Sequence, residues 1–243
     1  MEYPKVLIFD SAELLAEGFA EFFAEEVRTL LREKKFITVA LSGGNTPTKV
    51  FENLAGKFKD IIEWNRIHFY WVDERCVPMN SVESNYGNAW RVLFEKTGIV
   101  AEQLHPIYGE TDPDDEIHRY EDAILKYVQL KDGIPCFDMI LLGLGEDGHT
   151  ASIFPDRLDL FATQDITAHT VHPESGQNRI TLTGNVINNA ARIYFIVSGS
   201  KKSGMVKSII EETTESELLP AAKVQPKDGS VTWFLDSEAG KEL

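Results

Sequence analysis

The residues best suited to chemistry lie in one short stretch near the middle of the chain. An acidic side chain, Asp147, stands two residues before an imidazole, His149, and glycines occupy positions 143, 145 and 148. Glycine leaves little side-chain bulk near a ligand and permits backbone turns that other residues avoid. A neutral imidazole can accept a proton at physiological pH. The pattern predicts an active-site loop that carries a titratable pair.

This loop follows a predicted strand. Residues 139–142 form an apolar run without alternation, which is typical of a strand buried on both faces. Ligands of open α/β sheets bind outside the carboxyl ends of the strands, where this loop begins. The letters also match the Gly-x-Gly-x-x-Gly dinucleotide motif, but that motif needs a helix after its third glycine. Pro155 follows Gly148 by seven residues and would break such a helix, so we reject nucleotide binding.

The composition bounds the class of protein. The chain has 243 residues, 43% apolar and 26% charged, which can fill a sizeable core, and we expect one domain over residues 1–243. The two cysteines, Cys76 and Cys136, show no metal or redox spacing. No apolar stretch reaches the roughly 20 residues of a membrane span. We therefore expect a cytoplasmic protein that uses no metal and no other cofactor.

The net charge narrows the choice of partner. A formal charge of −15 argues against nucleic acid and against anionic membranes. It does not exclude a small anionic substrate, because charges are screened beyond about 8 Å at physiological salt. A few local cations in a cleft can then decide binding.

Hydrophobic periodicity predicts alternating strands and helices. A capping box of Asp10 and Glu13 is expected to begin the first helix, and Thr46 is expected to cap the second. Residues 156–178 are polar and poorly periodic, so we expect a long connection there. Further strands are expected at 6–9, 36–41, 67–72, 179–183, 193–197 and 231–235. The last of these would close the sheet.

A glycine pair between a predicted strand and a predicted helix is a candidate phosphate cradle. Gly43 and Gly44 would present backbone N–H groups and the positive end of a helix dipole to an anion. Ser42 and Thr46 add hydroxyl donors. A tight turn without a ligand is the alternative. No Gly-Lys-Ser/Thr follows, which argues against an ATPase.

Charged residues at other strand ends could complete such a site. Asp73 and Arg75 follow a predicted strand. Asp73 suits a hydrogen-bonding or acid–base role, and the fork of Arg75 suits phosphate, with a surface ion pair as the alternative. Arg179 begins another short strand. Lys201 and Lys202 follow Gly199 at a predicted helix start, where cations oppose the helix dipole and a bound anion would relieve that conflict. Which of the two lysines contacts the anion is left open.

His169 and His172 have a spacing that is compatible with a metal site. Two histidines without a third ligand rarely bind a metal in proteins. We therefore interpret both as loop residues.

Four sequence blocks stand in the order found in a known family. They are Ser-Gly-Gly-Asn-Thr-Pro at 42–47, Asp-Glu-Arg-Cys-Val-Pro at 73–78 with Ser-Asn-Tyr at 84–86, Gly-Leu-Gly-Glu-Asp-Gly-His-Thr-Ala-Ser-Ile-Phe-Pro at 143–155, and Arg-Ile-Thr-Leu-Thr at 179–183. With these blocks, which span most of its length, the chain resembles the 6-phosphogluconolactonases of the pentose phosphate pathway. It departs slightly at Ser203, where Ala is usual, and at Ala222-Lys223, where Ala-Gln is frequent.

The resemblance implies a three-layer αβα sandwich with a mostly parallel, Rossmann-like sheet. It implies hydrolysis of 6-phospho-D-glucono-1,5-lactone to 6-phosphogluconate, without a cofactor. The family's histidine falls on His149, its acidic and basic strand-end residues on Asp73 and Arg75, and the lysine of its Gly-x-x-Lys turn on Lys202. The implied partner is a phosphorylated sugar lactone, and we expect a monomer.

The chemistry that follows needs neither a metal nor a covalent nucleophile. A lactone has an activated acyl carbon, so water can attack it with His149 as general base. Asp73 is expected to contact substrate hydroxyls or water, and backbone N–H groups of residues 143–148 are expected to polarise the carbonyl. The candidate substrate-binding residues are Ser42, Gly43, Gly44, Thr46, Arg75, Gly145, Asp147, Arg179 and Lys202.

Two alternatives use the same fold. A glucosamine-6-phosphate deaminase or sugar-phosphate isomerase would be expected to have Ile-Ala-Phe after Gly-His and Tyr in place of Arg75, and neither is present. A non-catalytic sugar-phosphate sensor would normally carry a DNA-binding extension, and we expect no residues to be left over for one.

Overall fold

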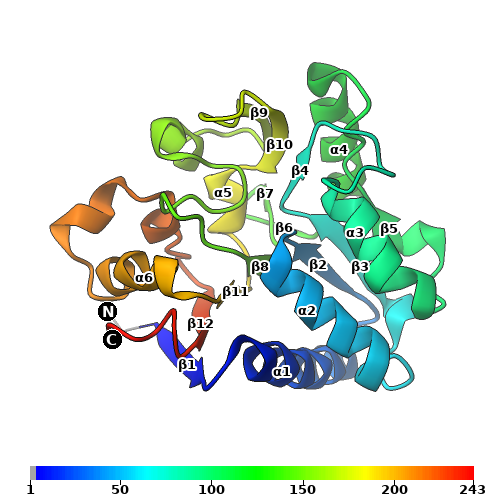
Figure 1. The fold of residues 1–243 in the computed structure, drawn as a ribbon. Helices are drawn as coiled ribbons and strands as arrows, with labels where there is room; N and C mark the ends of the chain where they lie inside the picture. The colour runs from blue at the N-terminus through cyan, green and yellow to red at the C-terminus, as the bar shows by residue number, and fades with distance from the viewer. Residues whose placement is uncertain (1–3) are drawn as a thin grey trace.

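A computed structural model describes residues 4–243, and its central element is a parallel sheet of seven strands (Figure 1). The strands are β1 (Lys5–Phe9), β2 (Ile37–Leu41), β3 (Ile67–Trp71), β5 (Leu104–His105), β8 (Met139–Leu142), β11 (Arg192–Val197) and β12 (Ser230–Asp236). Their order is β1-β12-β11-β8-β2-β3-β5, and every neighbouring pair is parallel. Strands β2, β3 and β8 are buried at every residue, which explains their nearly continuous apolar sequences.

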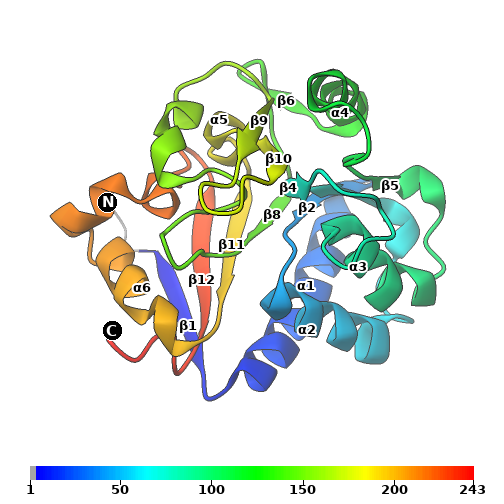
Figure 2. The same ribbon diagram turned by 45° about the horizontal axis from the view of Figure 1, so that its top comes forward.

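Helices cover both faces of this sheet, as predicted. They are α1 (Ala12–Glu33), α2 (Asn45–Asn53), α3 (Asn85–Val92), α4 (Pro113–Tyr127), α5 (Gly184–Ile187) and α6 (Ser203–Ile210). Crossovers between parallel strands are right-handed. A helix in a connection that moves along the sheet towards β5 therefore lies on one face, and a helix in a connection that moves towards β1 lies on the other. Figures 1 and 2 show α1 and α2 on one side of β11 and β12, and α6 on the other. The three-layer αβα architecture is therefore confirmed.

Two small antiparallel sheets and several short helical turns complete the chain. One sheet has the order β4 (Asp73–Arg75), β10 (Asn178–Leu182) and β9 (Thr167–Val171), and the other pairs β6 (Leu130–Lys131) with β7 (Ile134–Pro135). A π-helical turn spans Leu54–Phe58. Turns of 3-10 helix span Trp64–Arg66, Phe94–Lys96, Ala101–Gln103, Pro155–Phe161, Ser200–Lys202, Thr214–Leu218 and Pro220–Lys223.

The direction in which the chain crosses the sheet reverses between β2 and β8, which are parallel neighbours at the centre of the sheet. From β2 the chain crosses to β3 on one side, whereas from β8 it crosses to β11 on the other side. Loops that leave such neighbours separate at the carboxyl ends of the strands and form a crevice, where ligands of α/β proteins bind. These loops are residues 42–44 and 143–154, the two glycine-rich blocks of the sequence.

Two predicted helix caps are wrong. Ser11, and not Asp10, caps α1, because its hydroxyl accepts the N–H of Leu14 at 3.2 Å. Helix α2 follows Gly44, whose φ of 101° is accessible to glycine and strained for other residues. Thr46 consequently lies inside the first turn of α2 and is not its cap.

Two predictions about strands also need correction. The segment 156–178 is not merely a connection, since it contains β9 and a 3-10 turn. Strand β12 does not close the sheet, because it lies between β1 and β11 and leaves β1 at the edge. By contrast, β8 spans residues 139–142 as predicted. The first helical segment after Gly148 is the 3-10 turn Pro155–Phe161 and not an α-helix, in agreement with the rejected nucleotide motif.

The core joins the sheet to the helices through aromatic side chains. Phe19 of α1 contacts Phe234 of β12 edge to face, with ring centroids 4.8 Å apart, and is fully buried. Phe195 and Trp233 stack between neighbouring strands at 4.0 Å. Within residues 4–243, no helix is long and apolar enough to cross a bilayer.

Candidate active site

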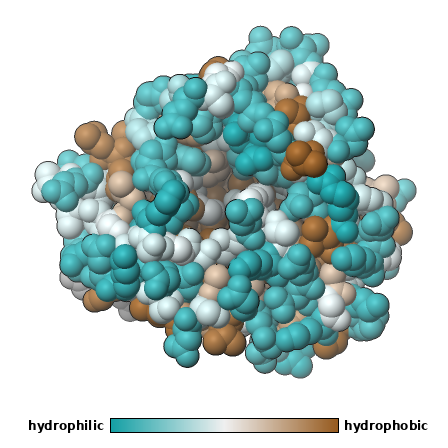
Figure 3. Space-filling view, viewed as in Figure 1, coloured by the Kyte–Doolittle hydropathy of each residue, from teal (hydrophilic) through white to brown (hydrophobic). Residues whose placement is uncertain are grey.

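A cavity of about 360 Å³ opens at the carboxyl ends of β2, β8 and β11. Figure 3 shows a hollow in the middle of this face, with mostly hydrophilic residues around it. The cavity brings together all but one of the predicted site residues, namely Ser42, Gly43, Gly44, Thr46, Asp73, Arg75, Gly145, His149, Arg179 and Lys202. The remaining candidate, Asp147, lies next to this wall but does not line it.

His149 and Asp147 form a hydrogen-bonded pair. Nδ1 of His149 lies 2.5 Å from Oδ1 of Asp147, and the backbone N–H of His149 donates to the same oxygen at 3.1 Å. A carboxylate only accepts, so the hydrogen of the neutral ring belongs on Nδ1. The lone pair then remains on Nε2, which is the nitrogen that can act as a base.

Asp147 therefore orients the histidine, whereas the sequence suggested that it binds substrate. Burial alone would raise the pKa of Asp147, but the hydrogen bonds and charge of His149 outweigh this and lower the pKa to about 2. Asp147 thus remains a carboxylate at physiological pH and can hold one tautomer of the ring.

Two glycines make room for this pair. A Cβ on Gly145 would lie 2.2 Å from Nδ1 of His149 and 2.6 Å from Oδ1 of Asp147. Gly148 has a φ of 80°, and a Cβ there would lie 2.7 Å from Leu219. Each position requires glycine because a larger residue would displace the pair or the chain around it.

The predicted role of Gly145 as a donor to substrate needs correction. Its N–H donates to the carbonyl oxygen of His149 at 2.8 Å, and the N–H of Gly148 donates to the carbonyl oxygen of Gly145 at 3.2 Å. Both groups stabilise the loop itself. The contribution of Gly145 to the site is steric.

Asp73 is a buried carboxylate that lines the cavity and is 7% exposed. Its Oδ2 accepts the hydroxyl of Ser152 at 2.6 Å, and the side-chain amide of Asn85 donates to its backbone oxygen at 3.0 Å. These contacts fix the carboxylate to the loop after β8 and to the start of α3. Asp73 follows β3, as predicted, and also begins a strand of its own, β4, which the sequence did not indicate.

Arg75 and Arg179 face each other across the small sheet. They are directly paired in the register of β4 and β10, and both line the cavity. Like charges in such a pair repel each other. Burial and the charge of Arg75 both lower the pKa of Arg179, which Asp73 partly offsets. Nε of each guanidinium is buried without a hydrogen-bond partner among the described residues, which favours an anion between them.

Lys202, and not Lys201, faces the cavity. Its Nζ donates to the carbonyl oxygen of Leu144, and burial lowers its pKa, opposed by the charges of Glu146 and Asp147. Lys201 is 77% exposed and pairs with Glu146 on the surface.

The first glycine turn packs closely against α3. A Cβ on Gly43 would lie 1.8 Å from Oδ1 of Asn85, so a residue with a side chain does not fit at this position. The hydroxyl of Ser42 donates to the carbonyl oxygen of Leu141 at 2.8 Å and is thereby committed to joining the loop ends of β2 and β8. Ser42 consequently positions the turn instead of offering a free hydroxyl.

The first glycine turn also contacts the turn after β11. The hydroxyl oxygens of Thr46 and Ser198 lie 2.8 Å apart, which links the start of α2 to the end of β11. The backbone at Gly44 faces open space, since a Cβ there would meet no atom within 4 Å. Both glycines line the cavity, but Gly43 packs against Asn85 whereas Gly44 has free space beside its Cα.

The sequence analysis did not identify Glu74 and Asn85 as parts of the site. Glu74 is 1% exposed and accepts the hydroxyl of Ser84 and the N–H groups of Asn85 and Tyr86, at 2.8 to 3.0 Å. A carboxylate at a helix N-terminus is stabilised by the helix dipole. Glu74 therefore anchors α3 and sets Asn85 between Asp73 and Gly43. The Ser-Asn-Tyr block at 84–86 was the available signal.

His172 follows β9 as a loop residue, as predicted, but it also lines the cavity, which the sequence analysis did not indicate. Its ring packs edge to face on Phe154, with centroids 5.1 Å apart, and the other neighbour of Phe154 is His149 at 5.0 Å. His169 was assigned wrongly, because it lies in β9 and not in a loop, with Nε2 3.0 Å from Oδ1 of Asn178. The alternation of Thr170 and His172 at a strand end was a signal for its position.

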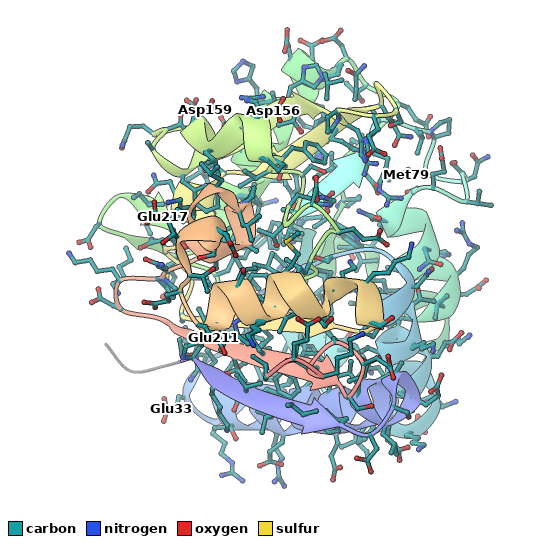
Figure 4. All side chains as sticks on the ribbon, turned by 60° about the vertical axis from the view of Figure 1, so that its left-hand side comes forward. Glu33, Met79, Asp156, Asp159, Glu211 and Glu217 are labelled. Atoms are coloured by element: carbon teal, nitrogen blue, oxygen red, sulfur yellow. The ribbon has the colours of Figure 1, made fainter. Side chains whose placement is uncertain are left out.

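The charges of the cavity differ from those of the exterior. Acidic side chains such as Glu33, Asp159 and Glu217 project from the periphery, as Figure 4 shows, whereas the cavity wall holds Arg75 and Arg179. Among residues 4–243, no three His, Cys, Asp or Glu side chains gather as a metal site would require. The prediction that no metal is used stays a prediction.

Comparison with known proteins identifies the family. Residues 10–233 match the model of the glucosamine-6-phosphate isomerases/6-phosphogluconolactonase family. The chain belongs to this family. The resemblance suggested by the sequence blocks is thus confirmed.

Individual relatives agree over nearly the whole length. The 6-phosphogluconolactonase of Haemophilus influenzae is 40% identical over 85% of this chain and 88% of its own. That of Treponema pallidum is 35% identical over 91% of this chain and 90% of its own. The crystal structure of 6-phosphogluconolactonase from Thermotoga maritima superposes with a TM-score of 0.83 at 30% identity, over 96% of this chain and 99% of that one.

Proposed function

We propose that the protein hydrolyses 6-phospho-D-glucono-1,5-lactone to 6-phosphogluconate in the pentose phosphate pathway. One observation carries this proposal: a histidine oriented by Asp147 lies in a cavity whose wall also holds paired arginines with unpartnered Nε–H groups. A base and an anion site in one cavity suit a phosphorylated substrate that reacts with water. Relatives named 6-phosphogluconolactonase support the same reaction.

In the proposed mechanism His149 is the general base. Nε2 takes a proton from water as the water oxygen attacks the lactone carbonyl carbon, and a tetrahedral intermediate forms. When the bond from this carbon to the ring oxygen breaks, the imidazolium returns the proton to that oxygen. Such assistance accelerates reactions by about 10²–10⁴-fold. Asp147 holds the ring in the reactive tautomer and stabilises the imidazolium.

Cationic residues would bind the phosphate and orient the lactone. Arg75 and Arg179 offer unpaired Nε–H groups, and Lys202 adds a third positive charge at the start of α6. The open backbone at Gly44 lies before the N-terminus of α2, which favours an anion. Fixing one end of the substrate in this way places the other end near His149 and lowers the entropic cost of reaction.

The test is lactone turnover measured against spontaneous hydrolysis, with a chelator present. We expect the wild type to accelerate hydrolysis. His149→Ala should lower the rate by about 10²-fold or more. His169→Ala, which removes the histidine bonded to Asn178, should keep the wild-type rate.

Two results would contradict the proposal. A folded His149→Ala protein with near-normal turnover would exclude the histidine as base. Conversion of glucosamine 6-phosphate, with no lactone turnover, would instead favour the glucosamine-6-phosphate isomerase activity that the family also contains.

A further inference from the structure

His172 stands at the end of β9, where the chain turns back into β10. The backbone N–H of His172 donates to the carbonyl oxygen of Gln177 at 2.9 Å, which extends the β9–β10 ladder by one pair beyond Val171 and Asn178. Alternate residues of a strand share a face. Thr170 and His172 therefore lie on one face of the hairpin, and Thr170 is paired with Arg179 in the register.

This face is the one that borders the cavity. Thr170 donates its hydroxyl to the carbonyl oxygen of Ser152, on the loop after β8, at 3.0 Å. Both Arg179 and His172 line the cavity. Diagonal neighbours on one face of an antiparallel pair lie about 7–8 Å apart at their Cα atoms, a distance that two long side chains can bridge. His172 is thus a neighbour of the arginine pair.

The tautomer of His172 is set by its own loop. Nδ1 lies 3.2 Å from the backbone N–H of Glu174 and 3.3 Å from that of Ser175, and it accepts from both. A neutral imidazole with an accepting Nδ1 carries its hydrogen on Nε2. Among residues 4–243 no side chain or backbone group accepts this hydrogen within bonding distance. The ring therefore keeps a donor for another molecule.

Phe154 holds the two histidine rings of the site in place. It is 1% exposed and contacts His149 at 5.0 Å and His172 at 5.1 Å between ring centroids. The two imidazole centroids are consequently no more than about 10 Å apart. The two rings are different tautomers, because Nε2 accepts in His149 and donates in His172. One phosphorylated hexose derivative can reach both.

We propose that His172 binds the phosphate of the substrate by donating its Nε2–H to a phosphate oxygen, beside Arg179. This inference rests on the proposed function for the identity of the substrate, but the anion site itself is argued from the arginine pair. The role of His172 is specificity: it would distinguish a phosphorylated lactone from an unphosphorylated one and take no part in proton transfer.

The experiment measures binding without turnover, by titration calorimetry with inorganic phosphate, 6-phosphogluconate and gluconate. In His172→Asn the amide oxygen replaces Nδ1 as the acceptor for the loop, and the Nε2–H is lost. We expect this variant to bind phosphate and 6-phosphogluconate about tenfold more weakly, with gluconate unchanged. His169→Asn is the matched control and should bind all three ligands like the wild type.

A second variant separates the contact from the fold of the hairpin. In His172→Gln the side-chain amide can place a donor near the position of Nε2, so it should bind phosphate more tightly than His172→Asn does. Wild-type binding of phosphate by a folded His172→Asn protein would overturn the proposal. Equal weakening for 6-phosphogluconate and gluconate would also overturn it, because it would locate the contact at a sugar hydroxyl.

The binding assay also separates this inference from the proposed function. If the wild type binds phosphate through His172 but does not hydrolyse the lactone, the reaction assignment is wrong and the phosphate contact stands. If it hydrolyses the lactone and His172→Asn keeps full phosphate affinity and full selectivity for the phosphorylated lactone, the phosphate contact is wrong and the reaction stands.

Discussion

At the scale of single residues, proton transfer and anion binding are carried by different charged groups of the site. Asp147 sits behind His149 and fixes one tautomer, and its lowered pKa of about 2 keeps it ionised while the histidine gains and loses a proton. The arginines lie on another sheet and face an anion. Separate placement leaves the histidine to accept a proton and the cations to bind an anion.

Asp147→Asn tests the orienting role. The amide can donate to Nδ1 through its NH₂ group, which would move the ring hydrogen to Nε2 and remove the base. We expect kcat to fall by about 10²-fold or more with KM nearly unchanged. Because both residues act as one unit, adding His149→Ala should cost little more. Additive losses in the double variant would show that Asp147 acts independently of His149.

Arg75→Ala and Lys202→Ala test the anion site. A hydrogen bond to a charged group is worth about 1.5–3 kcal/mol, so each change should raise KM for the phosphorylated lactone by roughly tenfold or more. The exposed neighbour provides the control, since Lys201→Ala should have little effect. Kinetics with phosphorylated and unphosphorylated lactone measure the selectivity. Unchanged selectivity in both cavity variants would place the phosphate elsewhere.

At the scale of elements, the loop after β8 provides the shape that the dyad needs. A Cβ on its first glycine, Gly143, would meet no atom within 4 Å, whereas a Cβ on Gly145 would lie 2.2 Å from Nδ1 of His149. The two positions look alike in the sequence. Their difference arises from the fold of residues 145–149, in which Gly145 and His149 are joined by a backbone hydrogen bond.

This difference predicts unequal effects of one methyl group. Gly145→Ala should push His149 away from Asp147 and lower kcat by at least about tenfold, because misplacing a catalytic group is costly. Gly143→Ala should keep near wild-type activity and stability. Steady-state kinetics and thermal unfolding of both variants provide the comparison. Equal behaviour of the two variants would mean that the loop tolerates the clash by moving as a whole.

The sequence predicted elements well where the physical signal was local. The apolar run of β8 lies within neighbouring residues of the chain, and its prediction was correct. The short strand β4 at Asp73 was not predicted, because its partner, β10, lies about a hundred residues away. His172 was missed for the same reason, since its contact with Phe154 and the cavity depends on how the β9–β10 hairpin packs.

At the scale of the whole molecule, the switch between β2 and β8 creates the crevice and the small sheet covers one side of it. Neither consequence can be read from a single segment, because the order of the strands decides both. The β5 edge of the sheet carries a second histidine group, which does not line the cavity. His105 on β5 lies with Nε2 2.9 Å from Nδ1 of His68 on β3, and it stacks on Tyr70 at 4.4 Å.

This second group should make the stability of the fold depend on pH. Burial, with smaller contributions from the charges of His68, Lys126 and Arg119, lowers the pKa of His105 to about 4. In the unfolded chain a histidine titrates near about 6.5. Between these values the unfolded state binds more protons, so the stabilising effect of the neutral ring is full above pH ~6.5 and is lost as pH falls towards ~4.

His105→Gln isolates this effect, because glutamine can keep a hydrogen bond to His68 but does not titrate. The free energy of unfolding of the wild type should fall by at most about 1.4 kcal/mol per pH unit through this group, and by less because the ring is partly solvated. Urea unfolding at about pH 7, 6 and 5 should therefore give a shallower slope for His105→Gln than for the wild type. Carboxylates titrate in both proteins and cancel in the difference. Parallel pH profiles would show that His105 titrates alike in the folded and unfolded states, and that the edge of the sheet between β3 and β5 admits water freely enough to solvate a charged ring.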